Sequence, residues 1–474
     1  MQPQTAIDAR VRLRRGVEST ARGGAASPRA PSPIGTVLLW LAALGNGGVV
    51  VWMWAHGGGI ASLSENLGTL LTSLGRLTAL LGTYLVLVQV LLLARLPWIE
   101  RRIGFDRLTV WHRRNGKVAV SLVVAHVPLI VTGYAMTVHI SIGAQIRELF
   151  SGYPGMVTAT IGTALLIAVV LSSLTIARRR LPYEAWYLVH LSVYGAILLA
   201  YFHQIPTGNE FIGHTSQRDY WYALYVVTIG LLLAFRVGAP ALRYRRYRLR
   251  VSEVRRESPD VVSIYIEGRG LQRLNARGGQ FFLWRFLSRG RWWQAHPFSL
   301  SAPPGGRSLR ITVKDVGNFS ARLAELRPGT AVIAEGPFGT FTPELSGERP
   351  VALIAGGIGI TPMRAMLDEL LRRGHALTVI HRVLHERDLV LSGELCQLTS
   401  AHGATVVNVV GDHEGQDGTR LLSSEHLREL VPDIAERDVY LCGPLEMMRH
   451  VRSSLLSAGT PPGRIHSERF ALAA

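Results

Sequence analysis

Six long apolar stretches constrain the fold of this 474-residue chain more than any other feature. A helix needs about 20 apolar residues to cross the hydrocarbon core of a bilayer. The stretches occupy residues 34–55, 68–94, 115–137, 155–177, 184–203 and 219–239. They predict an all-α bundle of six membrane-spanning helices over residues 34–240, and therefore an integral protein of the plasma or inner membrane.

Basic residues gather on one side of these stretches. Arginines crowd the N-terminal tail and the segments after the second, fourth and sixth stretches, whereas the opposite loops hold only Arg147 and Arg218. Cytoplasmic loops of membrane proteins are enriched in Lys and Arg, so both chain ends are predicted to be cytoplasmic. This distribution also accounts for the net charge of +18 without a nucleic-acid partner.

The N-terminal tail and the cysteines narrow the class of protein. Residues 1–33 are rich in Arg, Ala, Ser and Pro and predict a disordered cytoplasmic tail. The first 30 positions lack the apolar core of a cleavable signal peptide. Cys396 and Cys442 are isolated, so neither a disulfide framework nor a cysteine-based metal site is expected.

Four histidines lie in or beside the third and fifth apolar stretches. His112 and His126 are 14 residues apart, nearly four helical turns, so they share one helix face about 21 Å apart along the axis. His190 and His203 accompany the fifth stretch, which runs in the same direction. The topology therefore predicts that His112 meets His190 and that His126 meets His203. Such pairs can hold the irons of two stacked haems, with one histidine from each helix.

One feature of the fifth stretch does not fit an ideal helix. A separation of 13 residues leaves His203 about 140° from His190 around a straight helix, which predicts a tilt or a local irregularity. Arg76 is the remaining charge within the apolar stretches. Either it extends toward the interface, or it partners an outer haem propionate or an anionic acceptor.

The polar half of the chain contains two different strand patterns. Short alternating runs with Gly and Pro turns over residues 243–344 predict a small antiparallel β-barrel. Over residues 348–474, apolar strands alternate with helices, which predicts an α/β doubly wound parallel sheet.

The segment AGGIGITPM, residues 355–363, follows the first strand of that predicted parallel sheet. Glycine lets a backbone approach a pyrophosphate closely, and a helix N-terminus favours negative charge. The residues with these properties predict a dinucleotide site: Gly356, Gly357, Gly359, Thr361 and Pro362.

A set of spaced motifs carries a family resemblance. HPFSLSAPP (296–304), GGQF (278–281), EGPFG (335–339), AGGIGITPM, LCGP (441–444) and SERF (467–470) together resemble the ferredoxin–NADP reductase family. With the six stretches and four histidines added, residues 68–470 resemble the NADPH oxidase/ferric reductase superfamily, close to its prokaryotic members. The resemblance implies an FAD-binding domain, an NAD(P)H-binding domain, and FAD, NADPH or NADH, and two b-type haems as cofactors.

The resemblance also implies roles for individual residues around FAD. Phe298 would lie against the isoalloxazine, Ser299 would hydrogen-bond near its N5 atom, and His296 would lie near the phosphate side of the flavin, with Pro297 on the same strand. Phe470 would cover the flavin face. The pyrophosphate contacts would fall in KDVGNFS, at Lys314, Gly317 and Ser320.

Other implied roles concern the nicotinamide nucleotide and the outer haem. Cys442 and Gly443 would lie beside the nicotinamide, and Arg382 would bind the 2′-phosphate of NADPH. Leu384 stands where related reductases often have a second arginine, which leaves NADPH and NADH both open. Arg76 falls beside the outer haem, but Ile130 replaces a histidine that the oxidases often carry there.

Together these features predict a transmembrane oxidoreductase that passes electrons from cytoplasmic NAD(P)H through FAD and two haems to an external acceptor. Oxygen would make the chain an NAD(P)H oxidase, and ferric iron or a ferric chelate would make it a ferric reductase. The alternative is a membrane subunit that relays electrons to a partner protein or a quinone. The four histidines and the flavin motifs oppose a non-enzymatic transporter that binds a nucleotide.

Overall fold

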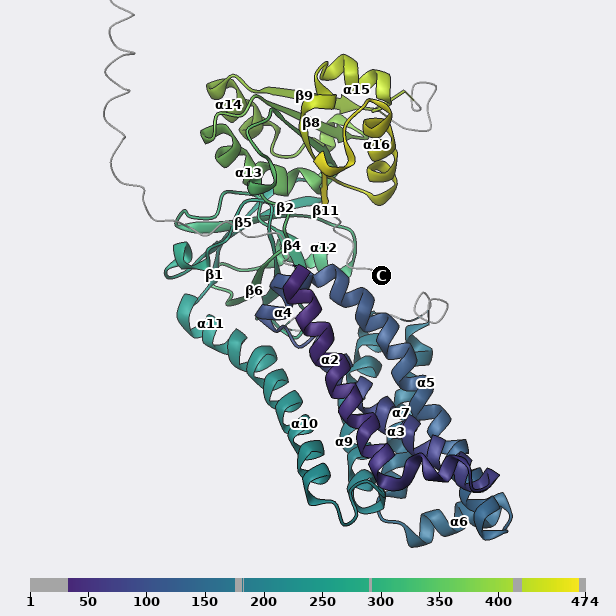
Figure 1. Cartoon of the computed structure of the whole chain (residues 1–474). Coiled ribbons are helices and arrows are strands. Elements are labelled where there is room, and N and C mark those ends of the chain that lie inside the picture. The colour runs from purple at the N-terminus through teal and green to yellow at the C-terminus, as the bar shows by residue number, and fades with distance from the viewer. Residues whose placement is uncertain (1–32, 175–180, 182, 290–291, 412–419, 469–474) are drawn as a thin grey trace, which may run out of the picture.

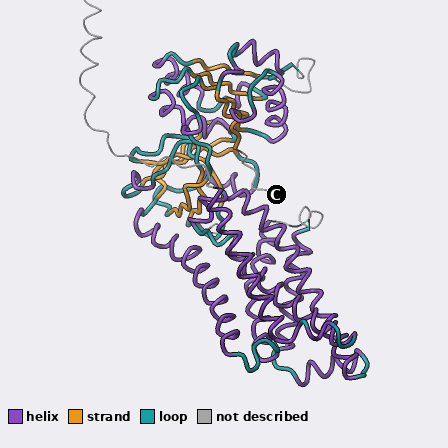
Figure 2. The backbone as a smooth tube through the Cα atoms, in the orientation of Figure 1, coloured by secondary structure: helices purple, strands orange, loops and turns teal. Residues whose placement is uncertain are grey.

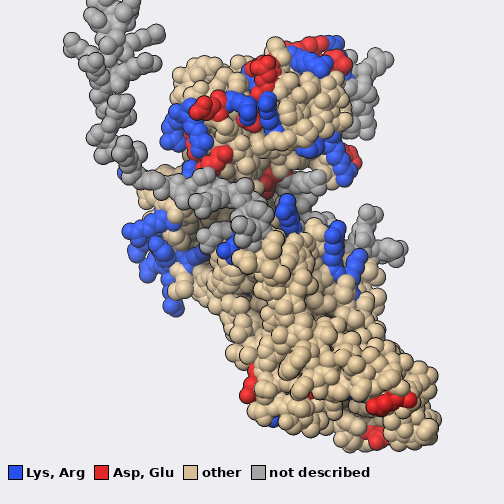
Figure 3. All heavy atoms as spheres, in the orientation of Figure 1, with Lys and Arg blue, Asp and Glu red and all other residues tan. Residues whose placement is uncertain are grey.

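The computed structural model describes residues 33–174, 181, 183–289, 292–411 and 420–468. Its three parts follow one another along a long axis, with a helical bundle at one end, antiparallel sheets in the middle and a parallel sheet at the other end (Figure 1). Figure 2 shows that the strands are confined to the two upper parts. On the face drawn in Figure 3, Lys and Arg side chains gather near the junction of the bundle and the sheets.

Six helices among the described residues are long and apolar enough to cross a membrane, which confirms the predicted spans. The helices of this half are α2 (Pro33–Trp54), α3 (Leu67–Leu92), α4 (Pro97–Ile103), α5 (Phe105–Val138), α6 (Ile142–Gly152), α7 (Met156–Ser173), α9 (Tyr183–Thr207), α10 (Thr215–Leu233) and α11 (Ala239–Tyr247). Helix α3 begins at a capping box, in which Asn66 and Thr69 each bond the other's backbone N–H. Helices α10 and α11 run down one side of the bundle and lead into the sheets (Figure 1).

Helices α3 and α5 approach each other closely because glycines face the contact. A Cβ atom added to Gly75 would lie 2.9 Å from the side chain of Ile130, and one added to Gly82 would lie 2.9 Å from Val123. In a bilayer, helices associate through such close packing because lipid tails are as apolar as leucine. The glycines of α3 therefore set the position of α5 and of its two histidines.

Six strands form two three-stranded antiparallel sheets in the order β1-β2-β5 and β4-β3-β6. Their bounds are β1 (Arg250–Ser258), β2 (Val261–Glu267), β3 (Phe281–Phe286), β4 (His296–Ser299), β5 (Ser308–Lys314) and β6 (Val332–Phe338). Both sheets enclose one apolar core, but only isolated bridges at Arg250–Ala331 and Leu300–Ile311 connect them. The predicted single barrel is not confirmed, because β4 is only four residues long and meets β5 at one position.

The remaining sheet is parallel, with the strand order β11-β10-β7-β8-β9. Its elements are β7 (Val351–Gly356), α13 (Ile360–Arg372), β8 (Leu377–Val383), α14 (Ser392–His402), β9 (Thr405–Val410), α15 (Ser424–Leu430), β10 (Asp438–Cys442), α16 (Leu445–Ser457) and β11 (Ile465–Glu468). Separate apolar cores pack around β7 on its two faces, one with α13 and the other with α16. This arrangement confirms the predicted doubly wound α/β fold.

Candidate active site

The structure brings the inner pair of histidines together between α5 and α9. The ring centroids of His112 and His190 are 6.1 Å apart. That separation matches two metal–nitrogen bonds of about 2 Å each plus half of each ring. At the outer level, His126 is in α5 and His203 is in α9. The predicted partners of the inner level are therefore neighbours, and the pairing at the outer level stays a prediction.

The ring nitrogens of these histidines show which atoms are left for a ligand. Nδ1 of His112 contacts the carbonyl of Gln89 at 3.2 Å, and Nδ1 of His126 contacts the carbonyl of Gly75 at 2.9 Å. A carbonyl partner on one ring nitrogen orients the other toward a metal. Nδ1 of His190 and Nδ1 of His203 are buried without a hydrogen-bond partner among the described residues. The chemistry of these four side chains would suit them to hold haem iron.

The composition of this site also fits a macrocycle better than a bare ion. Among the residues that the structure describes, no group of three or more His, Cys, Asp or Glu side chains is arranged to hold a metal ion. A pair of histidines suffices only where the other ligands come from elsewhere, as they do in a haem.

The tilt or local irregularity predicted for the fifth helix stays a prediction. Helix α9 is one continuous α-helix from Tyr183 to Thr207, and its internal proline, Pro206, comes after both histidines. Around His203 the helix meets the start of α7 closely. A Cβ atom on Gly155 would lie 3.0 Å from the backbone nitrogen of His203. At His203, α9 therefore packs closely against Gly155 and does not form a bulge.

Arg76 is paired within the bundle. Its Nε donates to Oε1 of Glu210 at 2.7 Å, and its side chain also donates to the carbonyl of Gly57 at 2.9 Å. The side chains of Arg76 and Glu210 are 14% and 2% exposed. This pair joins α3 to the segments after α2 and after α9, and the interpretation of Arg76 as an arginine that extends to the interface stays a prediction. A role beside the outer haem stays a prediction.

Several contacts join the bundle to the antiparallel sheets. Tyr187 of α9 stacks on Trp293 with ring centroids 5.8 Å apart, and Arg95 lies 4.9 Å from the ring centroid of Phe338. Burial lowers the pKa of Arg95 and raises the pKa of its ion-pair partner Glu100. Because Tyr187 precedes His190 by less than one turn, this junction places the sheets beside the inner histidines.

The HPFS strand presents a group of rings and one unpartnered hydroxyl. His296 stacks on Phe319 with centroids 3.7 Å apart, and the centroid of Phe298 lies 6.5 Å from that of Phe319 with the two ring planes nearly parallel. Ser299 is buried, and its Oγ has no hydrogen-bond partner among the described residues. A buried hydroxyl without a partner is costly, so Ser299 fits a ligand such as the flavin.

The residues predicted to bind the pyrophosphate are engaged within the protein. Lys314 lies 3.2 Å from a carboxylate oxygen of Asp260 and 3.8 Å from one of Asp388. The Ser320 hydroxyl donates to the carbonyl of Gly317 and accepts from the N–H of Val316, both at 2.9 Å. They lie at the end of β5 and the start of the short helix α12 (Asn318–Ala321), and their phosphate role stays a prediction.

The glycine turn and the LCGP loop meet backbone to backbone. A Cβ atom on Gly359 would lie 2.4 Å from the carbonyl oxygen of Cys442, and one on Gly443 would lie 3.0 Å from Cα of Gly356. Helix α13 begins at Ile360, so Thr361 and Pro362 fall in its first turn, while Gly357 has a φ of 52°. Burial raises the pKa of the Cys442 thiol well above its usual range, which keeps it neutral.

Two predicted site residues remain, Arg382 and Phe470. Arg382 is buried at the end of β8 opposite Gly356, and its side chain donates to the carbonyl of Val383. Its role in binding a 2′-phosphate stays a prediction. Phe470 lies outside the described residues.

Three site residues escaped the sequence analysis. Phe319 stacks on His296, Glu210 neutralises Arg76, and His381 reaches the carbonyl of Gly357 through Nε2 at 3.1 Å. Burial lowers the pKa of His381, so this histidine is neutral. Its position one residue before Arg382 is a sequence signal, whereas the other two contacts join distant segments.

Comparisons with known proteins agree with both halves of this arrangement. Residues 78–201 match the family of ferric reductase like transmembrane components, and residues 353–453 match the oxidoreductase NAD-binding domain family. Over 284 residues the chain is 30% identical to an NADPH oxidoreductase of Mycobacterium tuberculosis, covering 56% of this chain and 73% of that protein.

Two further similarities concern flavohemoproteins. A flavohemoprotein of Chromobacterium violaceum is 32% identical over 249 residues, which are 48% of this chain and 60% of that protein. The chain thus spans less than two thirds of that relative. The solved FAD/NAD-binding domain of a nitric oxide dioxygenase from Vibrio cholerae has 27% identity and a TM-score of 0.41, and the match covers 47% of this chain and 97% of that domain.

Proposed function

We propose that this chain, which belongs to the NADPH oxidase/ferric reductase superfamily, passes electrons from NADPH or NADH across the membrane to an acceptor. Its ferric reductase-like bundle and its FAD- and NAD(P)-binding domains make it an integral membrane oxidoreductase. The proposal adds the route through two b-type haems, the cytoplasmic position of both chain ends and the external acceptor.

One observation carries this proposal. Two histidine levels lie between α5 and α9, and the inner level is next to the stacking of Tyr187 on Trp293 from the antiparallel sheets. When bound, FAD would accept a hydride and release single electrons to the haems, which carry one electron each. The two levels then bridge a hydrocarbon core of about 30 Å.

The residues of this chain have distinct tasks in that scheme. His112 and His190 would hold the inner iron, and His126 and His203 the outer iron. Ser299 would donate its free hydroxyl to the flavin beside Phe298. The backbone turn at Gly356, Gly357 and Gly359 would accept the pyrophosphate of the nicotinamide nucleotide, with Cys442 and Gly443 beside its reactive ring.

The acceptor is proposed to be oxygen or a ferric chelate. The Arg76–Glu210 pair is neutral as a unit, so no free arginine charge attracts an anion there. This pairing supports a small acceptor that needs no anionic group over a carboxylate-rich one. Oxygen and weakly charged ferric complexes both satisfy that condition.

The test uses the full chain, purified with haem and FAD. An optical spectrum measures haem and flavin content, and anaerobic mixing with NADH or NADPH measures flavin reduction followed by haem reduction. Superoxide dismutase-sensitive cytochrome c reduction and ferric-chelate reduction then separate the two acceptors. Protein that binds FAD but no haem would contradict the proposed route.

A further inference from the structure

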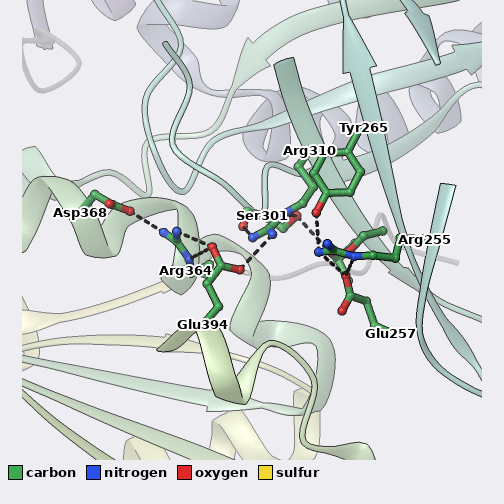
Figure 4. Close-up of polar contacts among 10 residues, drawn as sticks. Arg255, Glu257, Tyr265, Ser301, Arg310, Arg364, Asp368 and Glu394 are labelled. Carbon is green, nitrogen blue, oxygen red and sulfur yellow. Dashed lines mark hydrogen bonds and ion pairs between the residues drawn. The ribbon is translucent and has the colours of Figure 1, made fainter. Parts of the chain in front are cut away.

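A buried ionic bridge joins the FAD-binding sheets to the NAD(P)-binding unit. Glu394 of α14 lies between Arg310 of β5 and Arg364 of α13 (Figure 4). Its Oε2 is 2.9 Å from Arg310, and its Oε1 accepts from Nε of Arg364 at 2.7 Å. Arg310 and Arg364 are 5% and 6% exposed. One carboxylate thus pairs with two buried guanidinium groups from different domains.

One end of this bridge is tied to the flavin strand. Nε of Arg310 donates to the Ser301 hydroxyl at 3.1 Å, and the same guanidinium also donates to the Ser301 carbonyl. The Thr312 hydroxyl donates to Ser301 Oγ at 2.7 Å. Ser301 follows Ser299, the residue with the unpartnered buried hydroxyl, by only two positions. The position of Arg310 is therefore coupled to that of the HPFS strand.

The other end is tied to the glycine turn. Arg364 is in the second turn of α13, the helix that begins directly after Gly359, and it also pairs with Asp368 within that helix. The helix touches the sheets nearby, because a Cβ atom on Gly278 would lie 2.2 Å from the carbonyl oxygen of Ala365. The sheets and α13 are in backbone contact at Gly278. The ion pairs of Glu394 hold the two domains at a second point, which restrains rotation of one domain relative to the other about the first.

Other ion pairs also cross this interface, at longer distances than the 2.9 Å between Arg310 and Glu394. Lys314 lies 3.8 Å from Asp388, and Arg277 lies 3.3 Å from Glu369. In each pair the sheets supply the cation and the parallel-sheet unit supplies the carboxylate. The Lys314 and Arg277 side chains are 34% and 35% exposed, against 6% for Arg310, so the Glu394 bridge has the most deeply buried cation of the three, while the Glu394 side chain itself is 31% exposed.

Glu394 is ionised at neutral pH in this setting. Burial raises the pKa of Glu394, but the hydrogen bond from Arg310 and the charges of Arg364 and Arg310 together lower it below its usual value. Without this carboxylate, Arg310 would lose its ion-pair partner while Arg364 would keep only Asp368, and an uncompensated buried charge is strongly unfavourable. The two domains would then shift relative to each other to let water reach the arginines.

We propose that Glu394 is a positioning residue for hydride transfer, which holds the nicotinamide-binding turn in register with the flavin strand. This inference rests on the proposed flavin reduction by NAD(P)H. Hydride transfer depends steeply on the distance between donor and acceptor, and a misplacement of about 1 Å can cost on the order of 100-fold in rate. The residues proposed to bind the nicotinamide nucleotide lie at the glycine turn and do not include Glu394.

The experiment compares the Glu394→Gln variant with the wild type as full-length, FAD-loaded protein. Anaerobic stopped-flow mixing gives the limiting rate of flavin reduction and the apparent Kd for the nicotinamide. We expect the limiting rate to fall by about 10-fold to 100-fold, with the Kd changed by less than about threefold. The charge-transfer absorbance between nicotinamide and flavin should weaken as well. Glu429→Gln, at the exposed Arg420 ion pair of α15, is the control and should keep the wild-type rate.

Two further variants identify a positioning effect. Arg310→Gln should slow flavin reduction like Glu394→Gln, and the double variant should be no slower than the slower single variant, because both changes break one bridge. If Glu394→Gln protein fails to bind FAD, Arg310→Lys, which keeps the charge but not the fork of donors, gives the same comparison.

The outcomes separate this inference from the proposed function. A wild-type protein whose flavin neither NADH nor NADPH reduces would contradict the proposed function itself. A wild-type flavin that is reduced, together with variants of unchanged limiting rate or with a loss confined to Kd, would overturn the role of Glu394 alone.

Discussion

Helices α3 and α5 of the bundle meet through glycines, whereas the FAD- and NAD(P)-binding units add buried ion pairs to a close glycine contact at Gly278. At Gly75 the neighbouring helix is so close that a Cβ atom would lie 2.9 Å from Ile130. At the other interface, Arg310, Glu394 and Arg364 share charges over distances of 2.5 to 2.9 Å. The same chain therefore fixes its two electron-transfer regions by different interactions.

The surroundings explain this difference. A bilayer offers no hydrophobic gain for helix association, so close backbone packing dominates there. Ionisable groups in a membrane are costly and are retained for function, which agrees with four histidines and the paired Arg76. Between water-exposed domains an ion pair costs less, and its geometry can set an orientation. Variants in the bundle and at the interface of the FAD- and NAD(P)-binding units test this difference.

The largest effect is expected from removing an inner histidine. His112→Ala should lose about half of the haem absorbance, because one of two irons loses an axial ligand, and electron transfer across the membrane should fall to background. Flavin reduction by NAD(P)H should persist, since the bridged domains remain intact. Spectroscopy and stopped-flow mixing of purified protein measure both, and full haem content in this variant would contradict the assignment.

Breaking the charged pair of the bundle should be the next largest change. Glu210→Gln leaves Arg76 without its counter-charge, and loss of one partner of a buried pair costs about 3–5 kcal/mol. The thermal unfolding midpoint of the detergent-solubilised protein should drop accordingly. Glu65→Gln, at an exposed position between α2 and α3, is the control and should unfold like the wild type.

Overpacking the glycine contact should cost less. Gly75→Leu forces α3 away from Ile130, and overpacking costs typically about 1–3 kcal/mol. Gly48→Leu in α2, where a Cβ atom meets nothing within 4 Å, is the matched control. Equal unfolding midpoints for the two variants would show that the α3–α5 contact does not limit stability.

The smallest expected effect is a pH dependence of the ionic bridge. The folded-state pKa of Glu394 lies below its usual value, so its stabilisation is present at neutral pH and is lost as the pH falls through that folded-state pKa. The stability deficit of Glu394→Gln relative to the wild type should therefore be largest near pH 7 and shrink toward zero under acid conditions. Unfolding midpoints measured from pH 7 to pH 3 test this, and a deficit that grows at low pH would contradict it.

Much of the fold follows from local patterns in the sequence. Lengths of apolar stretches predict the six spans, and alternating strands and helices predict the doubly wound sheet, because both patterns reflect burial of individual elements. The glycines of AGGIGITPM fall where the parallel sheet meets the LCGP loop. The single barrel was not confirmed, since strand closure depends on the lengths of β4 and its loop rather than on periodicity.

Only the tertiary structure shows which distant side chains contact one another. The sequence by itself determined which residues can bind haem, flavin and nucleotide, since their chemistry and spacing lie within single elements. It did not reveal that Glu210 neutralises Arg76, that Phe319 stacks on His296, or that Glu394 joins Arg310 to Arg364. Those contacts join residues 23 to 134 positions apart. Only the packing of whole helices and sheets brings such residues within the few ångströms over which charges and rings interact.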